Sequence, residues 1–454
     1  MRRPAVWAVA LFLSTLLPGA VAAQGDLDRA RELQAEAQKD WNAGRFREGT
    51  PKAREALALR EKALGPEHPQ VAESLHALAQ LLRESGDYAG ARPLLERAIA
   101  IREQKLGPAS PQLAASLSSF GYLLYLTGET AAARPLLERA VRIHEQALGP
   151  GHPQLAFSLT NLGLVVWRSG DLAGARVLFE RALKIREQTL PPTNRWLAQS
   201  LTSLGEVLRD MGDYAAARPL LERALTIRET ALGPNHPDYA SGLTALGYLL
   251  HLTGDNAAAR PLLEKALAIR ERALGPDHPA VATTLNDVAL VLSRTGDYAA
   301  ARAHFERALK IREQALGLTH TGVAQSLTSL AVLLADAGDY AAARPLLERG
   351  LKTYEQAVGP DHHWVAWNAN HLARLLHRTG DTAGARALYE RALKIREKAL
   401  GPDHPSVAFS LQALAYRFYA EVAASEPALW ARTAAYRDAG CKGLGPVDES
   451  ALLL

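Results

Sequence analysis

Residues 275–316 read GPDHPAVATTLNDVALVLSRTGDYAAARAHFERALKIREQAL, and this 42-residue stretch decides the fold because its pattern recurs along most of the chain. Copies of its opening motif Gly275-Pro276-Asp277-His278-Pro279, several of them altered, start at Gly65, Gly107, Gly149, Gly233, Gly317, Gly359 and Gly401. The segment that starts at Pro191 keeps the spacing without the motif. A fixed period of this length predicts a stack of repeated supersecondary units rather than one compact core.

A second glycine marks the middle of each unit, and it stands at Gly44, Gly86, Gly128, Gly170, Gly212, Gly254, Gly296, Gly338 and Gly380. Apolar residues three and four positions apart on either side of it predict two helices, at residues 69–85 and 88–105 in one unit. Gly86 is expected to end the first helix with a positive φ, and Asp87 to cap the second helix. Each unit is therefore a helix, a tight turn, a helix and a short loop.

Small residues and prolines recur within these helices. Three positions in every unit are alanine or glycine, as at Gly163, Ala175 and Ala182, and two antiparallel helices pack closely only where no bulky side chain separates their backbones. Prolines stand about six residues into the second helix, at Pro93 and four equivalent positions. Because a proline there removes a helical hydrogen bond, the second helix is expected either to start later or to bend.

The small residues around Gly-Asp-Tyr resemble the tetratricopeptide repeat (TPR) family. The period and the phrases at residues 307–313 (RALKIRE) and 275–282 (GPDHPAVA) resemble its kinesin light chain-like subclass, over roughly residues 26–420. The resemblance implies an all-α fold, a right-handed α-α superhelix or solenoid of about nine helix-turn-helix units with a C-terminal capping helix. We interpret the chain as a bacterial exported member of this family.

The repeat boundaries divide the chain into five expected segments. They are a signal peptide at 1–23, a divergent N-terminal capping repeat at 24–64, eight TPR units at 65–400, a half repeat and capping helix at 401–439, and a disordered tail at 440–454. Glu36 and Asp40 take normally apolar positions in the capping repeat, which predicts that they face solvent. Trp430 and Tyr436 are expected to cover the last apolar face.

The first residues are typical of a secretory signal. Arg2 and Arg3 form a basic start, an apolar stretch follows from about Ala5 to Leu17, and small residues at 21–23 offer a cleavage site. This stretch is shorter than the roughly 20 residues that a membrane-spanning helix needs, which favours cleavage over retention as an anchor. The mature protein is expected to be periplasmic or secreted, with no membrane span.

Charge and cysteine content restrict the partners. Cleavage would lower the formal net charge from +4 to +2, because it removes two arginines and no acidic side chain. No block of lysine and arginine concentrates this charge, which argues against a nucleic-acid partner. Cys441 is the single cysteine, so no intramolecular disulfide can form.

No motif in the chain indicates catalysis. The sequence contains no glycine-rich phosphate loop, no Gly-x-Ser-x-Gly motif and no His-Glu-x-x-His pair, so no enzyme activity, cofactor or small-molecule substrate is expected. Histidines at equivalent loop positions, such as His68 and His152, are about 10 Å apart per repeat and cannot share one zinc ion. We interpret them as structural residues beside helix starts.

A partner-binding surface is expected on the concave wall that first helices line in this family. The candidate residues are His76, Arg83, Tyr122, Tyr125, Phe157, Asn161, Trp167, Arg209, Tyr248, His251, Asn286, Trp367, Asn370, Arg374, Phe409, Tyr416 and Tyr419. The inward positions vary between units and are rich in aromatic residues, although the whole chain is only 6% aromatic. Aromatic anchors beside polar groups suit a peptide or an extended protein segment.

Two aromatic patches are expected on this wall. The first combines Tyr122, Tyr125, Phe157 and Trp167, and the second combines Trp367, Phe409, Tyr416 and Tyr419. The alternative is that some of these rings only seal neighbouring units. The kinesin light chain family has an asparagine before the leucine of its Asn-Leu-Ala phrase that is placed to hold a peptide backbone. Only Asn161 matches it here, which favours recognition through side chains.

Three functions fit these observations. The leading hypothesis is a non-catalytic scaffold that binds a peptide or an extended protein segment in an aromatic-lined groove. One alternative is an architectural or self-assembling component of the cell envelope. The other is a regulatory sensor array for a separate effector enzyme.

Overall fold

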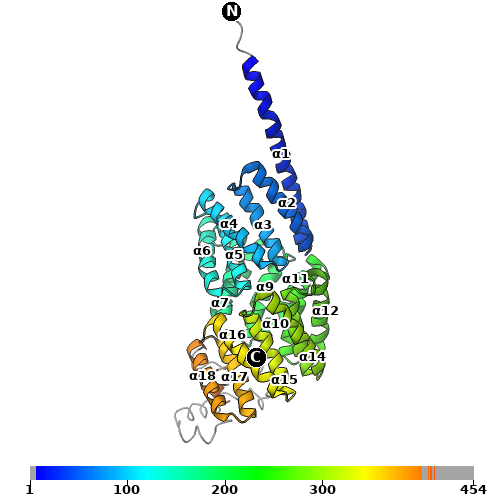
Figure 1. Cartoon of the computed structure of the whole chain (residues 1–454), viewed down its shortest axis with the longest axis vertical. Coiled ribbons are helices and arrows are strands. Elements are labelled where there is room, and N and C mark those ends of the chain that lie inside the picture. The colour runs from blue at the N-terminus through cyan, green and yellow to red at the C-terminus, as the bar shows by residue number, and fades with distance from the viewer. Residues whose placement is uncertain (1–6, 401–406, 408–409, 412–413, 415–454) are drawn as a thin grey trace, which may run out of the picture. The chain divides into compact units, whose positions relative to one another are not determined.

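The computed structural model describes residues 7–400 together with 407, 410, 411 and 414, and in this part of the chain it contains eighteen helices and no strand (Figure 1). The helices are α1 (Trp7–Asn42), α2 (Phe46–Leu64), α3 (Pro69–Glu84), α4 (Tyr88–Leu106), α5 (Pro111–Leu126), α6 (Thr130–Leu148), α7 (Pro153–Arg168), α8 (Leu172–Thr189), α9 (Arg195–Asp210), α10 (Tyr214–Leu232), α11 (Pro237–Leu252), α12 (Asn256–Leu274), α13 (Pro279–Arg294), α14 (Tyr298–Leu316), α15 (Thr321–Asp336), α16 (Tyr340–Val358), α17 (His363–Arg378) and α18 (Thr382–Leu400). The expected all-α fold is confirmed.

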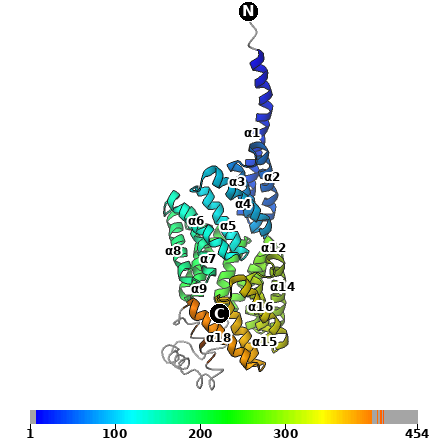
Figure 2. The same cartoon turned by 60° about the vertical axis from the view of Figure 1, so that its left-hand side comes forward.

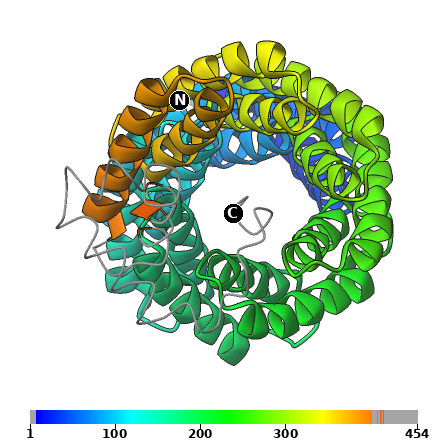
Figure 3. The same ribbon diagram turned by 90° about the horizontal axis from the view of Figure 1, so that it is seen from below.

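The chain forms two compact units. The N-terminal unit comprises Met1–Ala245 with Ala268–His278, and the C-terminal unit comprises Leu246–Leu267 with Pro279–Leu454. In the N-terminal unit, helices α3 to α9 follow one another side by side in chain order (Figure 2). In each unit the helices lie in an inner and an outer row (Figure 3).

Helices pack in consecutive pairs, as a solenoid requires. First helices pack on the second helices that follow them, as α3 does on α4, and second helices pack in turn on the first helix of the next pair, as α4 does on α5. First helices also contact each other directly, as α5 contacts α7. The first helices therefore lie on the side where neighbouring repeats approach most closely, the inner side of the curve.

Local sequence explains the turn inside each pair. Gly86 has φ of 86°, a conformation that residues with a Cβ adopt at a cost. Asp87 then begins the second helix, where its Oδ1 accepts a hydrogen bond from the backbone N–H of Gly90 at 2.8 Å. The same cap recurs at Asp171 and Asp213. Both predictions for this turn are confirmed.

The repeated histidine of the opening motif caps the first helix. Nδ1 of His68 accepts from the backbone N–H of Gln70 at 3.2 Å, and His152 does the same for Gln154. Asn194, which stands in the unit that lost the motif, accepts from Trp196 through Oδ1 at 2.9 Å. The interpretation of these residues as structural groups beside helix starts is therefore confirmed for the three loops.

Close packing of the two helices in a pair depends on the small positions. A Cβ on Gly163 of α7 would lie 2.5 Å from Cε1 of Phe179 on α8, closer than carbon atoms approach each other. Ala175 and Ala182 on α8 are completely buried. The predicted role of the small residues is confirmed, because they admit a large side chain from the facing helix.

The prolines lie inside the second helices. Helix α4 starts at Tyr88 and contains Pro93, so the expectation of a later helix start is wrong. Pro93 has no N–H to donate to the carbonyl of Ala89, four residues earlier. Ala89 is exposed, so water can donate to that carbonyl instead.

The prediction for Asp40 in the first repeat is wrong. Asp40 is only 3% exposed, and its carboxylate lies 2.7 Å from both Nη2 of Arg45 and Nζ of Lys52. Burial would raise the pKa of Asp40, but hydrogen bonds from Lys52 and Arg45 outweigh it and lower the pKa. The carboxylate therefore joins α1 to α2, whereas Glu36 remains partly exposed beside Lys52.

Several expectations concern residues outside the described ones. They are the start of the signal peptide before residue 7, most of the half repeat and capping helix at 401–439 with Trp430 and Tyr436, the tail at 440–454 and Cys441. Of the helices in the described part of the chain, none combines the length and the apolar composition that crossing a bilayer requires.

Candidate partner-binding surface

The candidate residues differ in how far solvent reaches them. Five are buried, at 7% exposure for Arg83, 2% for Asn161, 9% for Arg209, 2% for Asn286 and 8% for Asn370. The other candidates up to Arg374 are partly exposed. Phe409, Tyr416 and Tyr419 lie outside the described residues. The surface is therefore made of half-buried rings with buried polar groups between them.

Two arginines and two tyrosines form a continuous stack across three first helices. The guanidinium carbon of Arg83 on α3 lies 5.0 Å from the ring centroid of Tyr122 on α5. Tyr122 stacks on Tyr125 with centroids 6.0 Å apart, and the guanidinium carbon of Arg168 on α7 lies 3.9 Å from the Tyr125 ring. Each cation faces the electron-rich side of a ring, an attraction of about 0.5–2 kcal/mol. We call these four residues the Arg–Tyr stack.

Arg83 is the least satisfied member of the Arg–Tyr stack. Its Nη2 donates to Oε1 of Glu84 at 2.5 Å. Its Nε and Nη1 have no hydrogen-bond acceptor among the described residues, although both atoms are buried. A buried donor without a partner costs about 1–3 kcal/mol, so Arg83 is held in place at a cost to stability.

A polar cluster surrounds His76 beside the Arg–Tyr stack. Nδ1 of His76 lies 3.3 Å from Oγ of Ser116, and Nε2 lies 3.1 Å from the side-chain amide nitrogen of Gln80 and 3.3 Å from Oγ of Ser119. Burial lowers the pKa of His76 to about 3, and the charges of Arg102 and Arg83 add to this effect. His76 is therefore neutral at pH 7 and serves as a hydrogen-bonding group rather than a charge.

Asn161 holds two first helices together. It is 2% exposed, and its amide nitrogen donates to the carbonyl of Ser118 on α5 at 3.2 Å. Ser118 in turn lies 2.9 Å from Ser158 through the two hydroxyl oxygens. The Asn161 amide is thus engaged within the protein and not directed at a ligand.

Phe157 belongs to a cluster that the sequence did not reveal. Its ring meets the edge of Trp196 with centroids 6.4 Å apart, and Trp196 stacks on Trp41 at 6.0 Å. The guanidinium carbon of Arg195 lies 4.5 Å from the Trp41 ring and 4.8 Å from the Trp196 ring. Trp41 lies 42 residues before Arg83 and so takes an inward offset, but the divergent first repeat was not included among the candidates. Trp196, in the repeat without the motif, does not take an inward offset.

Trp167 and Arg209 share one acidic partner. The indole nitrogen of Trp167 donates to Oδ2 of Asp210 at 2.9 Å, and Nε of Arg209 donates to Oδ1 of the same residue at 2.8 Å. Glu206, one turn earlier on α9, is partly buried, and desolvation raises its pKa although the nearby charge of Arg209 acts to lower it. The single patch expected from Tyr122, Tyr125, Phe157 and Trp167 is thus divided into two. Phe157 and Trp167 contact α9, whereas Tyr122 and Tyr125 contact Arg83 and Arg168.

A second aromatic group occupies the C-terminal unit. Trp367 on α17 meets Tyr354 edge to face at 6.5 Å and His371 at 4.9 Å. Burial lowers the pKa of His371 to about 3, so this ring is neutral. The side-chain amide of Asn370 is oriented with its oxygen toward Arg396. In this orientation the oxygen accepts hydrogen bonds from Nη1 and Nη2 of Arg396, both at 2.8 Å. Tyr354 is 3% exposed, so the ring on which Trp367 packs is itself buried in the protein.

The remaining candidates lie in smaller groups of the C-terminal unit. Tyr248 and His251 have ring centroids 6.2 Å apart, and Nδ1 of His251 lies 2.7 Å from Oδ1 of Asn256. Nη2 of Arg374 lies 3.6 Å from Asp336. Asn286 is buried on α13, and its amide oxygen has no hydrogen-bond partner among the described residues.

The chemistry of this surface is that of recognition. It presents rings, guanidinium groups and amides, which suit stacking and hydrogen bonding. No three His, Cys, Asp or Glu side chains in the described ranges lie close enough together to hold a metal ion. Sequence reasoning missed Trp41, Trp196, Arg195 and Arg168. For Trp41 the available signal was its inward offset, one 42-residue period before Arg83.

Comparison with known proteins identifies the repeat. The family model described as tetratricopeptide repeat matches residues 41–104, 105–188, 196–272, 242–314, 283–356, 322–398 and 368–428. No curated protein sequence is significantly similar to the chain.

Three solved structures resemble it. One is a structure of nearly identical TPR-like repeats of the kinesin light chain type from Podosopora anserina. Its sequence is 27% identical to this chain, the TM-score is 0.36, and the match covers 45% of this chain and 98% of the other. BtubC (BKLC) from P. vanneervenii is 21% identical with a TM-score of 0.38, covering 51% of this chain and 90% of its own. A Rap protein complexed with Competence and Sporulation Factor is 15% identical with a TM-score of 0.59, covering 81% of this chain and 98% of its own. The Rap structure shares the fold.

Proposed function

The chain belongs to the tetratricopeptide repeat family, whose members are generally non-catalytic protein-interaction scaffolds, and we propose that it binds an extended protein segment along the first helices of its N-terminal unit. The Arg–Tyr stack carries this proposal. It runs across three consecutive repeats, from Arg83 on α3 to Arg168 on α7, so a segment bound along it would cross the helices and contact several repeats at once.

The chemistry of the stack defines the bound segment. Tyr122 and Tyr125 offer half-buried rings that can cover an apolar side chain at little conformational cost. The guanidinium groups of Arg83 and Arg168 make the stack positively charged, so a carboxylate or a backbone carbonyl of the segment would be a favourable acceptor beside it. The segment therefore needs one apolar group and one acceptor close together. The Rap protein of the same fold was solved with Competence and Sporulation Factor bound, which is consistent with a binding role.

A displayed random-peptide library tests this function. Peptides enriched on the wild-type chain are measured against Tyr125→Ala and against Tyr298→Ala, which changes a tyrosine that is 48% exposed on α14 outside the stack. We expect Tyr125→Ala to weaken binding by about 1–2 kcal/mol, roughly 5- to 30-fold, and Tyr298→Ala to leave it unchanged. Equal affinities for wild type and Tyr125→Ala, or no enrichment, would exclude this surface.

We also propose that the protein is exported. Arg2, Arg3 and the apolar stretch from about Ala5 to Leu17 support this proposal. Intact-mass measurement of the chain recovered from a secreting host tests it. A mass that corresponds to a start at Gln24 is the expected result, and a full-length chain in the cytoplasm would contradict it.

A further inference from the structure

Each repeat presents two edges to its surroundings. The loop edge consists of the loops that precede first helices, for example residues 65–68, 107–110 and 149–152. The turn edge consists of the turns between the two helices of a pair, for example residues 253–255, 295–297 and 337–339. These edges lie at opposite ends of the helices, because each helix runs from one edge to the other.

Inside the N-terminal unit, turn edge and loop edge meet. A Cβ on Gly44, in the turn after α1, would lie 2.6 Å from Cδ of Pro237 and 3.3 Å from Nε2 of His236. One repeat later, Nε2 of His278 lies 3.2 Å from the carbonyl oxygen of Glu84. Turns and loops that are far apart in sequence thus meet in order. The turn at Gly44 contacts the loop at His236, and the turn that follows Glu84, one repeat later, contacts the loop at His278, also one repeat later.

Side chains reinforce this contact. The guanidinium of Arg47 lies over Gly275, where a Cβ would come within 2.7 Å of Nη2. Trp41 stacks on Trp196 beside Arg195, as described above. The loop edge is therefore able to receive a turn edge, with the histidine that caps a first helix donating its second ring N–H to a turn carbonyl.

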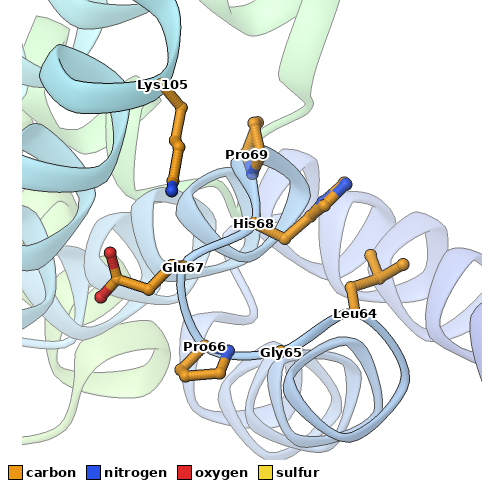
Figure 4. Close-up of a pocket in the computed structure, with 7 residues that line it drawn as sticks. All are labelled: Leu64, Gly65, Pro66, Glu67, His68, Pro69 and Lys105. Atoms are coloured by element: carbon orange, nitrogen blue, oxygen red, sulfur yellow. The ribbon is translucent and has the colours of Figure 1, made fainter.

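The glycines of the first loops are not covered as Gly275 is. Among the described residues, nothing lies within 4 Å of the Cβ positions of Gly65, Gly107 and Gly149. Figure 4 shows the loop at Leu64 to Pro69, which with Lys105 borders a shallow depression open to solvent. Nδ1 of His68 and of His152 accepts a hydrogen bond within its own loop, so Nε2 is the ring nitrogen left to contact another group.

The turns of the C-terminal unit present the complementary edge. Among the described residues, nothing lies within 4 Å of the Cβ positions of Gly254, Gly296, Gly338 and Gly380. Each of these glycines has a positive φ, as Gly44 does, so the turn backbone has the same form. The edge that Gly44 uses to contact a loop is therefore repeated in the C-terminal unit, where no loop of the described part of the chain lies against these glycines.

We propose that a second copy of this chain docks head to tail, the turn edge of the C-terminal unit of one copy lying on the loop edge of the first repeats of another. The interface continues a contact that the chain already makes within its N-terminal unit. The interface is heterologous, because two different surfaces of the same protein meet. A dimer formed in this way keeps one loop edge and one turn edge exposed, so further copies can add. It does not depend on a ligand in the groove.

Two edge variants test the proposal. The loop-edge variant carries Ala109→Arg and Gly151→Arg, and the turn-edge variant carries Thr295→Arg and Ala337→Arg, all at exposed positions. Val177→Arg on α8, at a residue that is 63% exposed, is the matched control away from both edges. The molar mass of the purified chain, with its N terminus defined by mass spectrometry, is measured by light scattering against concentration, without peptide.

The outcome distinguishes a head-to-tail interface from other association. Wild type and Val177→Arg should exceed the mass of one chain as concentration rises, and each edge variant alone should remain monomeric. An equimolar mixture of the two edge variants should form dimers that grow no further, because only one intact edge of each kind remains. Monomeric wild type at all concentrations, association that both variants retain, or a mixture that stays monomeric would overturn the proposal.

Discussion

Nη1 of Arg102 lies 2.6 Å from Oγ of Ser116, and this contact joins a second helix to the first helix of the next repeat. The same pairing occurs fourteen residues apart in four other places, as Arg60 with Ser74, Arg186 with Ser200, Arg312 with Ser326 and Arg396 with Ser410. These arginines are buried and hydrogen-bond to neutral oxygens. Burial lowers the pKa of Arg186 to about 10, but the side chain remains charged at pH 7.

Ser116→Ala should destabilise the contact between α4 and α5. The substitution leaves the buried Arg102 guanidinium with the carbonyl of Gln112 as its main remaining acceptor, a loss of about 1–3 kcal/mol. Amide hydrogen exchange in α4 and α5 measures this loss of local stability. A local measurement is needed because the stability of a repeat array is distributed along the chain. Arg134→Ala is the control, since the ion pair of Arg134 with Glu138 lies within α6, is 40–56% exposed and should contribute less than about 0.5 kcal/mol. Equal effects of both changes would contradict the importance of the buried contact.

Gly163→Ala should destabilise the α7–α8 pair by about 1–3 kcal/mol, because its Cβ would lie 2.5 Å from Cε1 of Phe179. Gly151→Ala is the matched control, since nothing lies within 4 Å of its Cβ position and its φ is not positive. Urea denaturation of both variants measures the difference. A Gly163→Ala protein as stable as Gly151→Ala would show that Phe179 can move aside without cost.

Stability should fall in mild acid through His76. The pKa of this residue is lowered to about 3 in the folded protein, below the ordinary value of 6.5, so the unfolded chain binds more protons between these two pH values. The free energy of unfolding therefore decreases as pH falls from 6.5 toward 3, and at pH 4 the loss is up to about 3 kcal/mol. His76→Gln keeps hydrogen bonding without titrating. Its urea midpoint should change less between pH 7 and pH 4 than the wild-type midpoint, and parallel changes would refute the assignment.

Trp41→Ala should loosen the contact between the first repeat and α9. The substitution removes the stack with Trp196 and the cation–π contact with Arg195, together about 1–3 kcal/mol. Faster amide exchange in α1 and at the start of α9 is the expected result. Met211→Ala, at a turn residue that is 42% exposed, is the control and should leave exchange in both segments unchanged. Unchanged exchange in Trp41→Ala would mean that this contact adds no local stability.

The repeat pattern was sufficient for the architecture because its determinants are local. Gly86 and Asp87 act within a few residues of their position, and the small residue Gly163 acts on the helix that directly follows. Most repeats carry the same or a similar group with the same neighbours, so one repeat largely explains the others. Asp40 was mispredicted because its partners Arg45 and Lys52 belong to a repeat that departs from the pattern.

The sequence by itself determined the helix pairs, their caps and the positions that must be small, all of which depend on neighbours within one or two repeats. Only the tertiary structure decided that Asn161 is engaged with Ser118, that Arg83 lies over Tyr122, and that Trp41 stacks on Trp196. The physical reason is curvature: a small rotation at every repeat accumulates along the N-terminal unit until turns and loops many repeats apart come into contact, and no single repeat encodes that sum.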